Sequence, residues 1–143
     1  MRKFLLFIVL VAVSCQKSGP ITIAKLDGYW EIEQVLGPDK LKKEYKINET
    51  FDHFAVDGQK GFRSKVQPQF DGTFLTNNQP EQFTITTSDG KTFLNYVTPY
   101  ASWKEEIVSL EDSTLVVKNA QNLEFHYKKT GPLNFTGNGK TTK

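Results

Sequence analysis

Side chains that carry out catalysis or bind metals are few in this sequence. It contains one cysteine, Cys15, and two histidines, His53 and His126, and none of them stands in a metal-ligand spacing. Glu105 and Glu106 are adjacent carboxylates, but neighbouring residues of a strand point to opposite faces and cannot act as a pair on one substrate. Nucleophile motifs of the Gly-x-Ser-x-Gly type and glycine-rich phosphate loops are missing from the body of the chain. The sequence therefore predicts a protein that is not an enzyme and that holds no metal or cofactor.

Cys15 ends a leader segment with its own chemistry. After a short basic start, residues 4–13 form an unbroken apolar run, which suits a signal peptide and is too short to span a bilayer. Small residues, Ala12 and Ser14, stand just ahead of the cysteine. This arrangement resembles a bacterial lipoprotein signal, and the resemblance implies a signal peptide over residues 1–14 and acylation of the Cys15 thiol, with chains such as palmitate as a membrane anchor. An ordinary secretory leader, with Cys15 as a bystander, is the alternative.

The segment after the cysteine is polar and broken by Gly19-Pro20, so residues 15–23 are expected to form a flexible tether. By analogy with enteric lipoproteins, Gln16 favours a lipid-anchored location at the outer membrane of a bacterial cell envelope. Two of the 18 basic residues precede Cys15, so the remaining 16 balance the 16 acidic residues of the chain. A folded part without net charge gives no reason to expect nucleic acid as a partner.

Short strands are expected between residues 24 and 129. Turn signals such as Asp57-Gly58 and Asp71-Gly72 separate runs of about six to ten residues rich in Phe, Tyr, Val, Ile and Thr. This rhythm predicts an all-β domain, either an antiparallel meander closed as a barrel or a sandwich. One short helix is conceivable between Leu36 and Tyr45. Residues 130–143 lack an apolar pattern and are expected to form a disordered tail.

Alternation within these runs assigns side chains to faces. Phe62, Ser64 and Val66 are expected to share the inward face of one strand, opposite Arg63, Lys65 and Gln67. A barrel for a polar ligand would instead turn Arg63 and Lys65 inward. Two later segments, residues 91–97 and 102–110, carry apolar side chains on both faces, as in strands that meet a partner or line a cavity.

The strand that begins with Gly28-Tyr29-Trp30 resembles the first strand of lipocalins, and the last strand contains Phe125-His126-Tyr127. Together with the leader and the Asp-Gly turns, the arrangement resembles the lipocalin-like lipoproteins of the Bacteroidota. The resemblance implies a small up-and-down antiparallel β-barrel of about eight to ten strands over residues 24–129. It implies that Gly28 and Trp30 form the barrel base, with Lys128 or Lys129 in the place of the arginine that lipocalins stack on this tryptophan.

Relatives of this kind bind small hydrophobic molecules, so the leading hypothesis is a lipid-anchored barrel that binds a small, partly hydrophobic ligand. The candidate lining residues, each of which could equally be core, are Phe62, Phe83, Phe93, Tyr96, Trp103 and Tyr127. The alternative is an envelope scaffold, inhibitor or assembly accessory with a filled core, which meets a protein partner through its outer surface. An enzyme that uses His53 or Glu105 ranks third. Asp112-Ser113-Thr114 resembles a short O-glycosylation motif of exported Bacteroidota proteins, which implies modification at Ser113.

Overall fold

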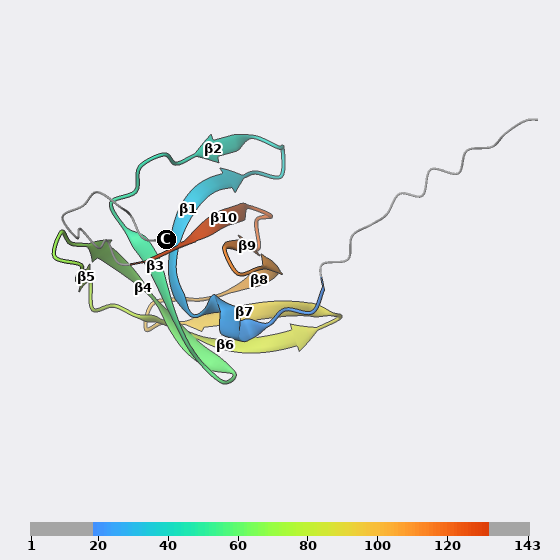
Figure 1. Ribbon diagram of the computed structural model, residues 1–143. Coiled ribbons are helices and arrows are strands. Elements are labelled where there is room, and N and C mark those ends of the chain that lie inside the picture. Colours follow the sequence, from blue (N-terminus) through green and yellow to red (C-terminus); the bar gives the residue numbers. More distant parts are fainter. Residues whose placement is uncertain (1–18, 132–143) are drawn as a thin grey trace, which may run out of the picture.

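The computed structural model describes residues 19–131, which form ten strands and one short 3-10 helix (Figure 1). The elements, in chain order, are η1 (Ile23–Leu26), β1 (Gly28–Leu36), β2 (Lys42–Glu44), β3 (Phe51–Asp57), β4 (Lys60–Pro68), β5 (Phe74–Thr76), β6 (Glu81–Ser88), β7 (Lys91–Val97), β8 (Ser102–Leu110), β9 (Thr114–Lys118) and β10 (Glu124–Thr130).

Eight of these strands form a closed ring. Their hydrogen-bonded order is β10-β9-β8-β7-β6-β4-β3-β1, and an antiparallel pairing of β1 with β10 closes the circle. The two shortest strands lie outside the ring, with β2 paired to β1 and β5 paired to β4. All pairings in the ring are antiparallel, and apart from the closing β1–β10 pair they join strands that follow one another along the chain once the two short strands are left out. The predicted all-β, up-and-down antiparallel barrel is therefore confirmed.

The barrel has one end closed by the chain before β1. We call it the closed end, and we call the opposite end, where β1 and β7 finish and β3, β6 and β8 begin, the mouth. At the closed end Leu26 and Trp30 are fully buried, and the Trp30 indole N–H donates a hydrogen bond to the Leu26 carbonyl at 2.8 Å. Gly28 adopts a backbone φ of +127°, which residues other than glycine rarely adopt. A Cβ at this position would lie 3.0 Å from the Lys129 Cε.

Inward-facing apolar side chains from the strands of the ring other than β4 fill the barrel above this plug. The largest fully buried ones are Trp30, Tyr96, Phe54, Leu26, Leu94, Leu115 and Val117. Burial of this much apolar surface is the main source of stability in a domain without a disulfide.

The structure corrects two local expectations. Leu36 to Tyr45 contains no helix but the end of β1, a turn and β2. The inward face of β4 carries Arg63 and Lys65, not Phe62, because Arg63 is paired in register with the buried Phe54 of β3. Alternation identifies two faces of a strand but does not tell which one faces the interior. Ser64 and Val66 are also buried, although they lie on the outer face, where Val66 is paired in register with the buried Phe51.

The expected domain limits can be compared with the structure only in part. Ile21 and Ile23, which precede the expected start at Ala24, already pack against the core, and β10 continues to Thr130. The predicted signal peptide (1–14), Cys15 and the tail beyond Gly131 lie outside the described residues.

Candidate functional site

Five charged side chains meet inside the mouth of the barrel. Asp52 and Glu81 stand at the beginning of β3 and β6, Arg63 and Lys65 lie in the middle of β4, and Glu105 lies on β8. Each belongs to the inward-facing set of its strand, because it is in register with a buried or inward-facing residue of the neighbouring strand. We call these five residues the mouth cluster.

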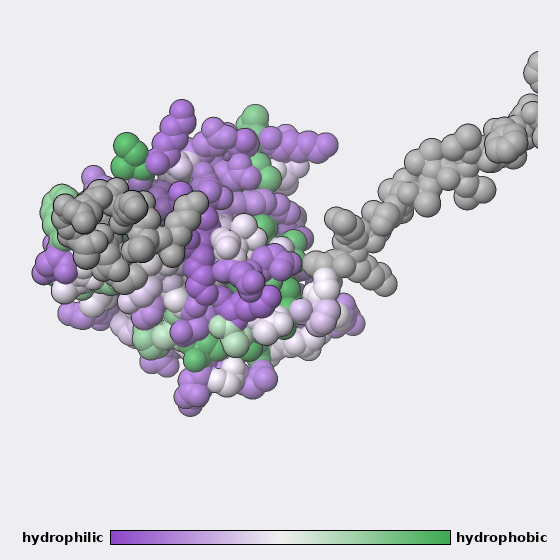
Figure 2. Space-filling model, viewed as in Figure 1, coloured by the Kyte–Doolittle hydropathy of each residue, from purple (hydrophilic) through white to green (hydrophobic). Residues whose placement is uncertain are grey.

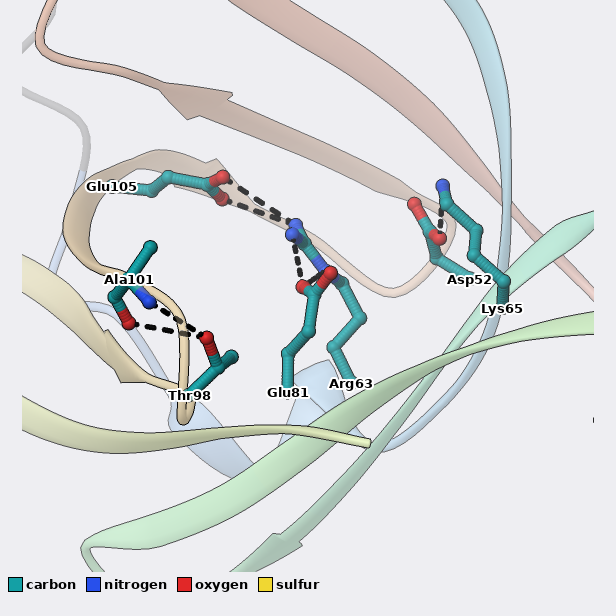
Figure 3. A network of polar contacts seen from close by, with 7 residues as sticks. All are labelled: Asp52, Arg63, Lys65, Glu81, Thr98, Ala101 and Glu105. Atoms are coloured by element: carbon teal, nitrogen blue, oxygen red, sulfur yellow. Dashed lines mark hydrogen bonds and ion pairs between the residues drawn. The ribbon is translucent and has the colours of Figure 1, made fainter. Parts of the chain in front are cut away.

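Arg63 is the centre of the mouth cluster (Figure 3). Its guanidinium donates from Nε to Glu81 Oε2 at 2.8 Å and from Nη2 to the same oxygen. Its Nη1 reaches both carboxylate oxygens of Glu105, but at 3.4 Å. The Arg63 side chain is 13% exposed and that of Glu105 is 10% exposed, so this contact is formed away from bulk water.

Lys65 and Asp52 form the second ion pair, visible beside Arg63 in Figure 3. The Asp52 side chain is almost fully buried, whereas that of Lys65 reaches the solvent. Tyr127 of β10 lies close to the same carboxylate, and its pKa is well above the ordinary value because of burial and then of the negative charge of Asp52.

The buried position of the cluster perturbs its protonation equilibria. Burial raises the pKa of Glu105, and the positive charge of Arg63 only partly opposes this effect. Burial alone would lower the pKa of Arg63, but the surrounding groups, including Glu105, Asp52 and Glu81, raise it above its usual value. Arg63 is therefore a permanent cation, and Glu105 takes up a proton more easily than an ordinary glutamate does.

Two aromatic side chains complete the site. The Tyr96 ring lies between the Arg63 guanidinium, 4.6 Å from its centroid, and the Trp103 ring, which stacks on it with centroids 5.0 Å apart and an angle of 11°. Tyr96 is 1% exposed, and its hydroxyl has no hydrogen-bond partner among residues 19–131. Burial raises the pKa of Tyr96 well above the ordinary value, so this unpartnered group is a protonated hydroxyl.

The opposite end of the barrel decides the type of fold. A 3-10 helix enters β1, Trp30 plugs the ring, and the Lys129 ammonium of the last strand lies over the Trp30 ring at 5.1 Å from its centroid. The chain forms a lipocalin-like barrel. Of the two lysines proposed from the sequence, Lys129 covers the tryptophan, and it also donates a hydrogen bond to the Lys25 carbonyl at 3.1 Å.

Several solved structures are similar to this lipocalin-like barrel. A lipocalin-like protein from Bacteroides uniformis ATCC 8492 is 12% identical with a TM-score of 0.47, and the match covers 74% of this chain and 99% of that one. For an uncharacterized protein from Bacteroides eggerthii DSM 20697 the values are 8%, 0.47, 73% and 99%. For apocrustacyanin C2 they are 11%, 0.45, 77% and 62%. No protein-family model and no curated protein matches the sequence.

Four of the six aromatic residues proposed to line the lumen point into the barrel. Phe83, Tyr96 and Tyr127 are buried there, and Trp103 is half-buried beside them. The remaining two face outward: Phe62 is 38% exposed, and Phe93 lies under the Lys104 ammonium on the outer face of β7 and β8.

The other residues considered from the sequence lie apart from the mouth cluster. His53 stacks on Tyr29 outside the barrel, with ring centroids 4.4 Å apart, and His126 contacts Glu124 at 3.2 Å. Ser113 is exposed in the turn between β8 and β9, where its modification stays a prediction. Within residues 19–131 no group of three His, Cys, Asp or Glu side chains is arranged to hold a metal ion, and none of the helices there has the length and apolarity to cross a membrane.

Sequence reasoning did not propose Asp52 or Glu81 as functional residues, and it named Glu105 only for the third-ranked hypothesis of an enzyme. Arg63 and Glu105 are 42 residues apart in the chain, so only closure of the ring brings them together. One signal was available: Arg63 is the single arginine after the leader, in a strand whose two faces could not be told apart.

A separate groove of about 530 Å³ lies against the wall made by β3, β4, β6 and β7. It is lined mainly by outward-facing residues, among them Ala55, Phe62, Gln82 and Val97. Gly61 and Phe83 also line it. This groove does not include any residue of the mouth cluster.

Proposed function

We propose that this protein is a lipid-anchored lipocalin-like protein of the cell envelope that binds a small, partly hydrophobic ligand at the mouth of its barrel. The observation that carries the proposal is the mouth cluster with the unpartnered hydroxyl of Tyr96. Burying several charges contributes little to stability compared with apolar packing of the same volume. A cluster of this kind, at the open end of a barrel, is typical of a site that recognises a polar group.

The position of the ligand follows from the packing below the cluster. Trp30, Phe54, Leu94 and Leu115 are fully buried and fill the barrel between the cluster and the closed end. Trp103 and Glu81, by contrast, keep part of their surface exposed at the mouth. We therefore place the polar group of the ligand against the mouth cluster and its apolar part toward the rim, not deep in the barrel.

The rim provides apolar surface for such a ligand. The exposed large apolar residues in or next to the connections at the mouth end are Leu41, Ile47, Phe70, Leu75, Val97 and Tyr100. The face drawn in Figure 2 is hydrophilic over most of its area and carries only small, separate hydrophobic areas.

The anchor is proposed to hold the barrel by its closed end. Gly19, Pro20 and Ile21 lie against the turn between β6 and β7, which belongs to that end. Four residues lead from Cys15 to Gly19, a distance of at most about 14 Å in an extended chain. An acylated Cys15 would therefore keep the closed end near the membrane and direct the mouth away from it.

The proposal is tested with the mature protein purified from its own envelope. Small molecules released by denaturation are identified by mass spectrometry, and the emptied protein is screened by thermal denaturation against a library of amphipathic compounds. We expect a co-purifying molecule or a stabilising compound, and loss of both when Tyr96 and Trp103 are replaced by leucine. The proposal fails if neither is found for the unmodified protein.

A second function is favoured by the groove beside Phe62 and Val97. Phe62 is 38% and Val97 is 62% exposed, so an apolar partner would bury surface that the barrel leaves in water. A scaffold or accessory that meets an envelope protein through this wall is the alternative. Cross-linking in cells from position 97 that repeatedly recovers one protein would support it.

A further inference from the structure

The mouth cluster contains more acidic than basic groups. Its acids are Asp52, Glu81 and Glu105 and its bases are Arg63 and Lys65, three against two. Lys65 contacts Asp52, and the short hydrogen bonds of Arg63 go to Glu81. The only ion pair of Glu105 is through the 3.4 Å contacts to Nη1, and its other partner, the Trp103 side chain, carries no charge, so Glu105 is the carboxylate whose charge is least compensated.

Two neighbours of Glu105 complement a positively charged group. Trp103 lies two residues away on the same inward face of β8, and its ring is half-buried, with one face stacked on Tyr96. An indole ring attracts cations more strongly than the other aromatic side chains do. The Tyr96 hydroxyl, buried and without a partner, provides in addition a free acceptor and donor at the same level of the barrel.

We propose that Glu105, Trp103 and Tyr96 form a subsite for an organic amine, bound as its ammonium ion, at the mouth of the barrel. The inference rests on the proposed ligand-binding function and names the chemical class of the polar group. The ammonium group donates hydrogen bonds to the Glu105 carboxylate and lies near the indole ring, while the apolar part of the amine contacts the rim.

An anionic ligand suits this site less well. A carboxylate next to Arg63 would bring a fourth negative charge to two positive ones, in a place where Glu105 already lacks compensation. An ammonium ion makes the numbers of positive and negative charges equal, and it does so at the carboxylate that has the longest contacts to its partner.

Protons take part in the binding equilibrium. The groups that face Glu105 are Arg63 of β4, Glu81 of β6 and Tyr96 of β7, with the Asp52–Lys65 pair and Tyr127 farther along the wall. Because burial raises the pKa of Glu105, this carboxylate takes up its proton at a higher pH than an ordinary glutamate does. Binding of an ammonium ion requires the carboxylate form, so protons are released on binding and affinity decreases as the pH falls.

The test uses three probes that share a phenyl group and differ in the polar group: phenethylamine, 2-phenylethanol and phenylacetate. Affinities for the full mature protein are measured by calorimetry at neutral pH, and proton release is measured at pH 5.5 in two buffers that differ in ionisation enthalpy. We expect phenethylamine to bind at least about tenfold more tightly than the other two, with protons released to the buffer. Glu105→Gln should lose at least about tenfold in affinity for the amine and release no protons.

Glu106→Gln is the matched control, because Glu106 is the next residue, faces outward and pairs with Lys118 at 3.4 Å. It should bind phenethylamine as the unmodified protein does. Trp103→Phe, which keeps an aromatic ring, should bind the amine more weakly without a change in proton release. Equal binding of all three probes, preference for phenylacetate, or no binding of the amine would each overturn the amine subsite. The proposed function is judged separately, by the co-purified molecule and the library screen.

Discussion

Replacement of Arg63 by methionine is expected to destabilise the barrel by about 3 kcal/mol at neutral pH. Removing one partner of a buried ion pair costs about 3–5 kcal/mol, because the other charge is left uncompensated in a medium of low polarity. Of the two carboxylates that Arg63 contacts, Glu105 is 10% exposed and Glu81 is 33% exposed. Only Glu105 loses its partner away from water, so we expect a value at the lower end of that range.

The charge of Glu105 is the reason for this cost, so the cost should depend on that charge. In Arg63→Met, protonation of Glu105 relieves the unpaired charge, and the loss of stability should be smaller at pH 5.5 than at pH 7. The double variant Arg63→Met/Glu105→Gln should recover about 1–2 kcal/mol relative to Arg63→Met, because glutamine carries no charge. Urea denaturation followed by tryptophan fluorescence measures the free energy of unfolding of each variant.

Lys42→Met is the control for this experiment. Lys42 pairs with Glu44 at the surface, where the two side chains are 47% and 55% exposed, and loss of such a pair changes stability by less than about 1 kcal/mol. A loss below about 1 kcal/mol in Arg63→Met as well, or no recovery in the double variant, would refute the reasoning. It would mean that Arg63 and Glu105 are solvated like the pair on β2.

Three further predictions concern the barrel wall and its closed end. Trp30→Phe removes the buried indole donor and should cost about 2 kcal/mol in urea denaturation; a loss below about 0.5 kcal/mol would contradict the plug. Gly61→Ala should lower the free energy of unfolding by at least about 2 kcal/mol, since the new Cβ would lie 2.8 Å from the Phe83 Cζ. Gly131→Ala is the control, because a Cβ there meets no atom within 4 Å and stability should not change. Burial lowers the pKa of His53, so the stability that neutral His53 contributes is lost as the pH falls below 6.5, the ordinary pKa of histidine. His53→Phe should make the melting temperature depend less on pH in this range. An unchanged pH dependence of the melting temperature would contradict the assignment.

Much of the fold was available from local sequence patterns. The Asp-Gly turns and the alternation of large apolar residues predicted short antiparallel strands, and the Gly28-x-Trp30 strand predicted the plugged end. These features depend on residues within one hairpin or one strand. Lys128 and Lys129 could be named as candidates to cover Trp30 because of the resemblance to lipocalins, in which an arginine of the last strand stacks on this tryptophan, and the structure places Lys129 there.

The mouth cluster could not be predicted in the same way. The faces of β4 were assigned in reverse, because its outer face is also apolar and partly buried, with Val66 at 5% exposed. The Arg63–Glu105 contact joins β4 and β8, which are not neighbours in the sheet, so it depends on the curvature of the closed ring. The alternation of side chains along one strand contains no information about contacts across the interior of a barrel.

The central claim is that a carboxylate inside the mouth is buried without sufficient compensation and recognises a positive group. The most direct test is a titration of the glutamate side-chain carboxyl carbons by nuclear magnetic resonance, with and without phenethylamine, assigned through Glu105→Gln. We expect the pKa of Glu105 to lie above the ordinary glutamate value in the free protein and to decrease when the amine is added. A Glu105 that titrates at the ordinary value and does not respond to the amine would contradict the account.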